Sequence, residues 1–214
     1  SEGVFSMDGD TAPIKELLAL AKEHNAWLMI DDAHGFGALG KTGLGSCEAL
    51  LDEGLALPDI LVITFGKAVA SSGACVLANN EFINYMLQFN RDYTYSTAMS
   101  PLMAALTLTR LQAIKCADVK RQQLISNIAF FKQLCKQHAI AVMDSNTAIQ
   151  PIVLGCAEQT LHAAQRLKQQ GIWLTAIRPP TVAHNTARLR VTLTAAHTHA
   201  DITALVEQLK GGIA

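Results

Sequence analysis

Lys67 is the one charged side chain between Asp59 and Glu81, and it lies in a largely apolar run, residues 60–74. Surface lysines usually share their neighbourhood with other charges. A lysine held among apolar groups has a lowered pKa, because burial disfavours the ammonium, and the neutral amine can attack a carbonyl carbon to form a Schiff base. The run therefore predicts either a Schiff-base lysine or a loop lysine whose head reaches water.

Asp31 and Asp32 follow a second apolar run, residues 27–30. Ligands of open α/β sheets bind at the carboxyl ends of the strands, so Asp31 and Lys67 share one edge if their strands are parallel neighbours. A lysine and a carboxylate suit pyridoxal phosphate (PLP), because the lysine forms the imine and the carboxylate keeps the pyridine nitrogen protonated. A helix cap or a turn is the alternative for each aspartate. Strand residues alternate sides, so we expect Asp31, and not Asp32, to face the site.

A glycine-rich segment from Gly35 to Thr42 matches the phosphate-loop pattern G-x-x-x-x-G-K-T and contains G-x-G-x-x-G. A phosphate loop must begin a helix whose amino end holds the phosphate. Thr42 is followed by Gly43-Leu-Gly45, which disfavours a helix, and the two preceding aspartates would repel a triphosphate. The pattern favours a flexible loop at the sheet edge, and a nucleotide-binding protein is the alternative from another class.

Two further groups could bind a ligand. Arg188 and Arg190 alternate along a predicted strand and so face the same side, where two guanidinium groups suit a carboxylate or a phosphate. A solvated strand face is the alternative for at least one of them. His197 and His199 have a spacing that could ligate a metal, but they lie at a helix start, and we predict no metal site.

The composition excludes several classes of protein. Half of the 214 residues are hydrophobic, the net charge is -1 and the pI is near 6.6, so neither nucleic acid nor an anionic membrane is an expected partner. No apolar run is long and unbroken enough for a transmembrane helix. Five cysteines without C-x-x-C spacing indicate reduced thiols in the cytoplasm, and neither disulfides nor zinc.

Strands and helices are expected to alternate, which predicts an α/β fold with a mostly parallel sheet. We expect residues 1–100 to be part of a large domain, 101–137 a long helical connection broken near Asp118, and 138–214 a small α/β domain. The expected strands are 27–31, 60–64, 73–78, 149–154, 172–177 and 188–193. The other expected helices are 13–24, capped by Asp10 or Thr11, 80–89, 158–170, and one that begins at the box Thr198-x-x-Asp201.

Five segments together resemble one family. They are SEGVFSMDGD at 1–10, DDAHG at 31–35, TFGK at 64–67, YST at 95–97 and RLR at 188–190. This set resembles the α-oxoamine synthases, which are PLP enzymes with the aspartate-aminotransferase fold, and the resemblance covers essentially the whole chain. It implies the C-terminal part of a PLP fold type I subunit that forms a homodimer.

The resemblance implies a role for each matching residue around the cofactor. Lys67 would be the lysine that bonds to PLP and moves the substrate proton, and Asp31 would pair with the pyridine nitrogen. His34 and Ser6 would hydrogen-bond around the phenolic oxygen. Thr64 would help to anchor the cofactor near its phosphate.

The resemblance also implies a substrate side. Arg190 would hold the amino-acid carboxylate, Thr181 would lie near the acyl substrate, and Ser96 and Thr97 would reach the phosphate of the neighbouring subunit. The runs 175–182 and 186–197 are most similar to members that condense L-alanine with a pimeloyl thioester of coenzyme A or an acyl carrier protein. The alternative is a sister enzyme of the glycine acetyltransferase, aminolevulinate synthase or serine palmitoyltransferase type.

Two departures from the family pattern set further expectations. Ala70 stands where the family usually has glycine, which leaves the turn after Lys67 less free. The first residues read as the end of a strand and there is no initiating methionine, so we expect a piece of a longer protein. The family's N-terminal half supplies a group that stacks on the cofactor ring and part of the phosphate cradle. We therefore expect the isolated chain to be inactive, and a catalytically silent domain is a third alternative.

Overall fold

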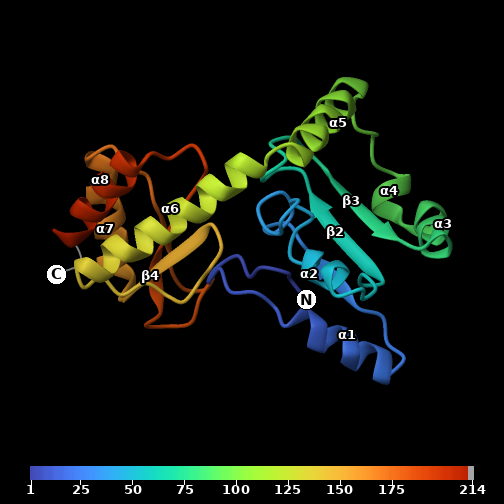
Figure 1. Cartoon of the computed structure of the whole chain (residues 1–214), viewed down its shortest axis with the longest axis horizontal. Helices are drawn as coiled ribbons and strands as arrows, with labels where there is room; N and C mark the ends of the chain where they lie inside the picture. Colours follow the sequence, from blue (N-terminus) through green and yellow to red (C-terminus); the bar gives the residue numbers. More distant parts are fainter. Residues whose placement is uncertain (212–214) are drawn as a thin grey trace. The chain divides into compact units, whose positions relative to one another are not determined.

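The computed structural model describes residues 1–211 and divides the chain into two compact units. Unit 1 consists of Ser1–Val4 and Thr11–Asp118, and unit 2 consists of Phe5–Asp10 and the chain from Val119 onward (Figure 1). The chain thus leaves unit 1 for six residues and then returns. The end of the expected small domain, residues 212–214, lies outside the described residues.

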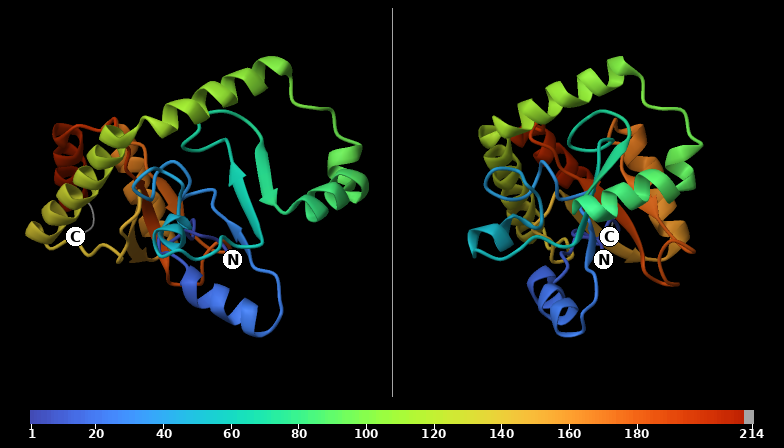
Figure 2. Two further views of the ribbon diagram at one scale, coloured as in Figure 1. Left: turned by 45° about the vertical axis from the view of Figure 1, so that its right-hand side comes forward. Right: turned by 90° about the vertical axis from the view of Figure 1, so that its right-hand side faces the viewer.

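Unit 1 contains a three-stranded sheet of order β1-β2-β3, formed by Met29–Asp31, Ile60–Thr64 and Ala74–Ala78. Strands β1 and β2 are parallel, whereas β2 and β3 are antiparallel, and β2 and β3 lie side by side in both views of Figure 2. The expected α/β class is confirmed, but the sheet is mixed and not mostly parallel. The reason is the short turn between β2 and β3, since a parallel neighbour would need a crossover of a dozen or more residues.

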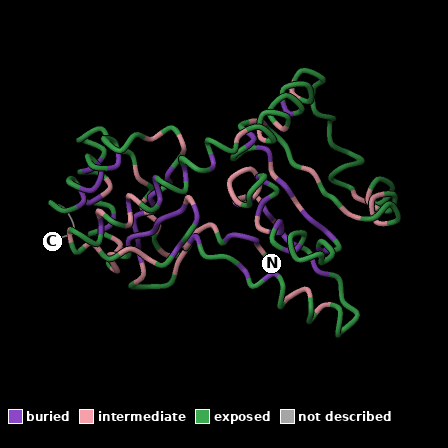
Figure 3. Tube along the Cα trace, in the orientation of Figure 1, coloured by how far each residue is buried: buried purple, intermediate pink, exposed green. Residues whose placement is uncertain are grey.

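The core of unit 1 lies around β1, β2 and the helices α1 (Ile14–Glu23) and α2 (Glu48–Asp52). Figure 3 shows buried residues along β2. The expected α1 is present, but it begins after Pro13 without a side-chain cap, so the expected cap at Asp10 or Thr11 is wrong. Thr11 is instead paired with Val4 in an isolated β-bridge, which takes its side chain out of the capping position.

The rest of unit 1 is helical and largely exposed. Helix α3 (Asn80–Phe89) is present as expected, whereas the short α4 (Arg91–Thr94) was not expected, and α5 spans Pro101–Lys115. Asn79, Asn90 and Ser100 each cap the helix that follows with a side-chain oxygen. No helix within residues 1–211 combines the length and apolar character that crossing a bilayer needs.

Unit 2 contains an antiparallel sheet of order β4-β6-β5, formed by Ile149–Gly155, Ala187–Thr192 and Thr175–Ile177. Its helices are α6 (Asp118–Gln137), α7 (Ala157–Gln169) and α8 (His199–Lys210). Strand β5 is shorter than expected because the backbone N–H of Ile172 donates to Leu167 O and closes the end of α7.

Two local predictions about helices are confirmed. The expected break near Asp118 separates α5, which ends at Lys115, from α6. Thr198 and Asp201 form a capping box at the start of α8, and the apolar face of that helix is buried.

Candidate active site

The carboxyl ends of β1 and β2 bring together several of the expected cofactor residues. Asp31 is the last residue of β1 and lies opposite Val62 in the parallel ladder, and Thr64 is the last residue of β2. Lys67 follows three residues later in the turn to β3. The expected meeting of a carboxylate and a lysine-bearing turn at one sheet edge therefore agrees with the strand pairing.

Of the two surroundings that the sequence left open for Lys67, the structure has the exposed one, in a loop and not among apolar groups. Its side chain is exposed, and Nζ lies 2.9 Å from His34 Nε2. The apolar side chains on either side of it, Phe65 and Val69, are the ones that enter the core. The alternation around Lys67 turns the amine outward, toward the loop that follows β1.

The two adjacent aspartates have different surroundings. Asp31 is partly buried, and its Oδ1 accepts the backbone N–H of Ala33 at 2.9 Å. Asp32 is fully buried, and both of its oxygens accept hydrogen bonds from Ser46, from the hydroxyl at 2.6 Å and from the backbone N–H at 3.0 Å. Asp32 is therefore an internal anchor, and Asp31 is the aspartate that is accessible at the edge.

The carboxylate of Asp32 is enclosed by glycines. A Cβ atom built on Gly35 or Gly45 would overlap its oxygens, and Gly45 has φ +92°, where other residues are strained. Burial raises the pKa of Asp32 to about 6, although the hydrogen bonds from Ser46 act in the opposite direction. Ser46 could not be predicted as the partner of Asp32, because only the folded loop brings the two together.

Glu48 organises the other end of the same loop. Its buried carboxylate accepts the backbone N–H groups of Thr42 at 2.8 Å and Leu44 at 2.9 Å, and a Cβ on Gly40 would overlap it. Lys41 is occupied by an ion pair with Asp52. The glycine-rich segment thus encloses carboxylates of its own chain and does not begin a helix, as a phosphate loop would.

In unit 2 the two arginines of β6 contact the short segment Phe5–Asp10. Arg190 is partly buried, with Nε donating to Ser6 O at 2.7 Å and Nη1 to Thr192 Oγ1 at 3.1 Å. Arg188 is buried and forms an ion pair with Asp8. Burial lowers the pKa of both guanidinium groups, which nevertheless keep their charge at neutral pH. The alternative prediction, that these side chains lie on a solvated strand face, is therefore wrong for both of them.

The other expected site residues lie in exposed segments. Ser96 and Thr97 follow α4 in unit 1, and all residues from 91 to 100 are exposed. Thr181 lies in unit 2 in the loop after β5, where its backbone N–H donates to Arg178 O at 3.1 Å. Among the expected residues, Lys67 thus contacts His34 in unit 1 and Arg190 contacts Ser6 in unit 2, whereas Thr181 makes its hydrogen bond within its own loop.

The described part of the chain does not support a metal site or a cysteine nucleophile. Within residues 1–211 no three His, Cys, Asp or Glu side chains gather as a metal site. Burial raises the pKa of the thiols of Cys47 and Cys135 to about 11 and about 12, so neither is a nucleophile near neutral pH. His197 Nδ1 accepts the backbone N–H of Thr194, and His199 stacks on Phe130.

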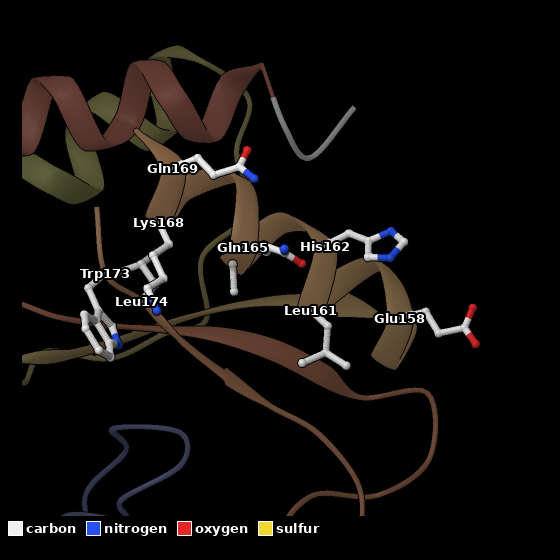
Figure 4. Close-up of a pocket in the computed structure, with 9 residues that line it drawn as sticks. Glu158, Leu161, His162, Gln165, Lys168, Gln169, Trp173 and Leu174 are labelled. Carbon is white, nitrogen blue, oxygen red and sulfur yellow. The ribbon is translucent and has the colours of Figure 1, made fainter. Parts of the chain in front are cut away.

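A surface hollow in unit 2 runs along α7 and the residues that follow it (Figure 4). Lys168 Nζ lies 4.6 Å from the ring centroid of Trp173 at one side of it. None of the expected site residues lines this hollow, and its polar side chains are exposed. The hollow therefore offers no fixed polar group that would orient a ligand.

Comparison with known proteins identifies the class to which this fold and these residues belong. Residues 1–209 match the family model for aminotransferase class I and II. The chain belongs to this family. The α/β fold of a PLP fold type I subunit is confirmed by solved structures of that type, which the chain matches over nearly its whole length.

The relatives within that family narrow the comparison. The chain is 49% identical to an 8-amino-7-oxononanoate synthase of Marinomonas sp. (strain MWYL1), over 98% of the chain and 52% of the relative. It is 48% identical to the synthase of the same name from Serratia proteamaculans (strain 568), over 98% of the chain and 54% of the relative. The chain thus spans about half the length of the curated relatives that it matches.

Solved structures of two differently named enzymes match the fold of this chain over nearly its whole length. A serine palmitoyltransferase from S. paucimobilis with a bound PLP–myriocin adduct has a TM-score of 0.90 and 30% identity, and the match covers 99% of this chain and 53% of that chain. The 8-amino-7-oxononanoate synthase of Francisella tularensis has a TM-score of 0.83 and 30% identity, covering 98% and 61%.

Proposed function

We propose that the protein carrying this chain is an 8-amino-7-oxononanoate synthase that uses PLP. It would join L-alanine to a pimeloyl thioester, releasing carbon dioxide and the free thiol of the carrier and forming 8-amino-7-oxononanoate. The observation that carries the proposal is the placement of Asp31 and Thr64 at the ends of adjacent parallel strands, with Lys67 in the turn that follows. The choice of substrates rests on the identity of nearly half of the residues with relatives of that name.

The residues at this edge fit PLP. Thr64 Oγ1 is buried and has no hydrogen-bond partner within residues 1–211, so a phosphate oxygen nearby would satisfy it. Asp31 is an anchored carboxylate that can hold a proton on the pyridine nitrogen, and Lys67 is an accessible amine. When it is bound, PLP supplies an electron sink for charge that develops on the substrate carbon.

The side chains of unit 1 would handle the proton and the cofactor. The hydrogen bond to His34 Nε2 holds the amine of Lys67 in place, and Lys67 would remove the α-proton of L-alanine. His34 would hydrogen-bond to the phenolic oxygen of PLP, a role that the resemblance also gives to Ser6. Thr64 would donate its hydroxyl proton toward the phosphate.

The side chains of unit 2 would bind the substrates. Arg190 would hold the carboxylate of L-alanine, because a guanidinium makes charge-assisted hydrogen bonds to a carboxylate. Thr181 would lie beside the acyl chain. Ser96 and Thr97 of unit 1 would contact the cofactor phosphate of a second subunit in a homodimer.

The first experiment tests the lysine in the full-length protein that contains this chain. The PLP-loaded protein is reduced with borohydride and digested, and the modified peptide is mapped by mass spectrometry. We expect a pyridoxyl group on Lys67, and Lys67→Ala should abolish both the adduct and turnover. A pyridoxyl group on another lysine would contradict the assignment.

The second experiment tests the substrates. L-alanine, glycine and L-serine are each combined with pimeloyl, acetyl, succinyl and palmitoyl thioesters, and thiol release is measured. We expect the largest kcat/KM for L-alanine with a pimeloyl thioester. A preference for L-serine with a palmitoyl thioester would instead favour the serine palmitoyltransferase type, whose solved structures this chain resembles in fold.

A further inference from the structure

Arg188 is a buried charge whose role the proposed reaction does not explain. Its side chain is 8% exposed, yet it lies two residues from Arg190 on the same strand. One of its contacts reaches the segment Phe5–Asp10, which is far away in sequence, and another reaches Thr186, at the end of the loop that directly precedes β6. A buried guanidinium that makes several contacts fixes the positions of its partners, because losing any of them would leave a charge uncompensated.

The first partner is Asp8, which lies in the turn that carries Ser6. Asp8 Oδ1 is buried and accepts no hydrogen bond within residues 1–211, so the nearby charge of Arg188 is what compensates it. The following residue, Gly9, is also fixed, because its carbonyl oxygen accepts the hydroxyls of Ser145 at 2.9 Å and Thr147 at 3.0 Å. The turn is therefore bound at Gly9, three residues after Ser6, to the segment that precedes β4.

The same turn is attached to Arg190. Arg190 Nε donates to Ser6 O at 2.7 Å, so the backbone of Ser6 and the guanidinium of Arg190 move together. A shift of the turn after the loss of the Asp8 contact would therefore displace the residue proposed to bind the alanine carboxylate.

The second partner lies in the loop that carries Thr181. Arg188 Nε donates to Thr186 O at 3.0 Å. Thr186 in turn closes the loop, since its hydroxyl donates to Ala183 O at 2.8 Å. The guanidinium of Arg188 thus contacts both the loop that carries Thr181 and the segment Phe5–Asp10 that carries Ser6.

We propose that Arg188 and Asp8 are a positioning pair. The pair holds Ser6, Arg190 and the loop with Thr181, residues 178–186, in the relative positions that binding of L-alanine and the thioester requires. This inference rests on the proposed function for the identity of the substrates. The proposed role of both residues is to hold other groups in place and not to contact the substrates. The two contacts of Arg188 are expected to affect different substrates. The contact with Asp8 supports the residues that bind L-alanine, and the contact with Thr186 supports the loop beside the thioester.

Two substitutions test the two contacts of Arg188 separately. Asp8→Asn removes the charge beneath the Ser6 turn and leaves Arg188 in place. Arg188→Lys keeps a positive charge that can pair with Asp8, but a lysine has no Nε–H that could reach Thr186 O at the same time. Two control variants lie in the same unit: Ile202→Val, in the core of α8, and Asp144→Asn, which removes an exposed ion pair with Lys132.

Hydrogen exchange of the protein without PLP tests the positioning directly. In Asp8→Asn we expect the amides of Phe5 and Gly9 to exchange about tenfold faster or more, since these amides donate hydrogen bonds within the turn. In Arg188→Lys we expect the same change at Thr181 and Thr186. The control variants should leave these four amides unchanged.

Steady-state kinetics of the PLP-loaded protein tests the consequence. In Asp8→Asn we expect the KM for L-alanine to rise about tenfold or more and the KM for the thioester to change less, because a small misplacement of a binding group is costly. Arg188→Lys should show the opposite order. The inference is overturned if both variants shift the two KM values in proportion, as a general loss of stability in Ile202→Val would. Failure of the proposed function is distinct, because the unmodified protein would then show no turnover of these substrates while the exchange pattern could still be measured.

Discussion

Unit 1 and unit 2 each place two like charges close together in sequence, and each buries only one of them. At the end of β1, Asp32 is buried and Asp31 is accessible, and on β6 Arg188 is buried and Arg190 is partly exposed. The two buried charges are compensated differently. Asp32 accepts hydrogen bonds from the neutral groups of Ser46, whereas Arg188 has a carboxylate partner in Asp8.

The difference follows from the chemistry of the two groups. A carboxyl group can take up a proton when it is buried, so neutral donors are sufficient for Asp32 and its pKa rises to about 6. A guanidinium cannot lose its proton in a protein, so Arg188 requires a countercharge. We therefore expect the buried member of each pair to support structure, with a pH dependence only in unit 1, and the accessible member to act on the ligand.

The largest effect is expected on kcat, from substitution of Asp31. Asp31→Asn in the full-length protein should lower kcat about 10³-fold, because the substitution removes the charge that would hold a proton on the cofactor ring. Asp32→Asn should lower kcat far less, and its main effect should be on folding of the loop that Ser46 closes. The measurement is turnover at matched PLP occupancy. Equal losses in the two variants would contradict the division of roles.

Arg190 gives the next largest effect. Arg190→Ala should raise the KM for L-alanine about 10²-fold, because a charge-assisted contact to the carboxylate is lost, typically about 2–5 kcal/mol. The effect on the thioester KM should be much smaller. A larger rise in Arg188→Ala at equal thermal stability would reverse the roles of the two arginines.

Asp32 should make stability depend on pH. Its pKa is raised from 3.8 to about 6 in the folded state, so the folded protein holds a proton that the unfolded chain releases, and stability falls as pH rises through this window. Between about pH 5 and about pH 7.5 the free energy of unfolding should fall by about 1.4 kcal/mol through this group. Asp32→Asn should remove that part of the slope, measured by denaturant unfolding at each pH. Ile202→Val, which changes no titratable group or charge, should not alter the slope.

Ala70 gives the smallest expected effect. It has φ +52° in the turn after Lys67, and in unit 2 Ala139 has φ +56° after α6. Glycine relieves the strain of this conformation, so Ala70→Gly and Ala139→Gly should each raise the free energy of unfolding by about 0.5–1 kcal/mol. Only Ala70→Gly should also change the exchange of amides around Lys67. A loss of stability in both variants would show that the turns tolerate alanine without strain.

Much of the candidate site was open to prediction from the sequence. The run around residues 60–64 indicated β2, the run before Asp31 indicated β1, and parallel pairing placed both ends at one edge. These predictions succeeded because apolar strands and their ends are local features of the chain. The same local reasoning left the surroundings of Lys67 open, since an apolar neighbourhood in sequence does not show which side chains of a turn enter the core.

The sequence by itself determined the strands, most helices, the capping box of α8 and the family. Only the tertiary structure decided which charge of each pair is buried, that Ser46 and Glu48 hold the glycine-rich loop, and that Asp8 meets Arg188 across 180 positions of sequence. The physical reason is that burial and charge pairing depend on segments brought together by folding. The glycines of the loop match a phosphate-binding pattern because carboxylates of the same chain, and not a phosphate, require the same close approach of backbone to an anion.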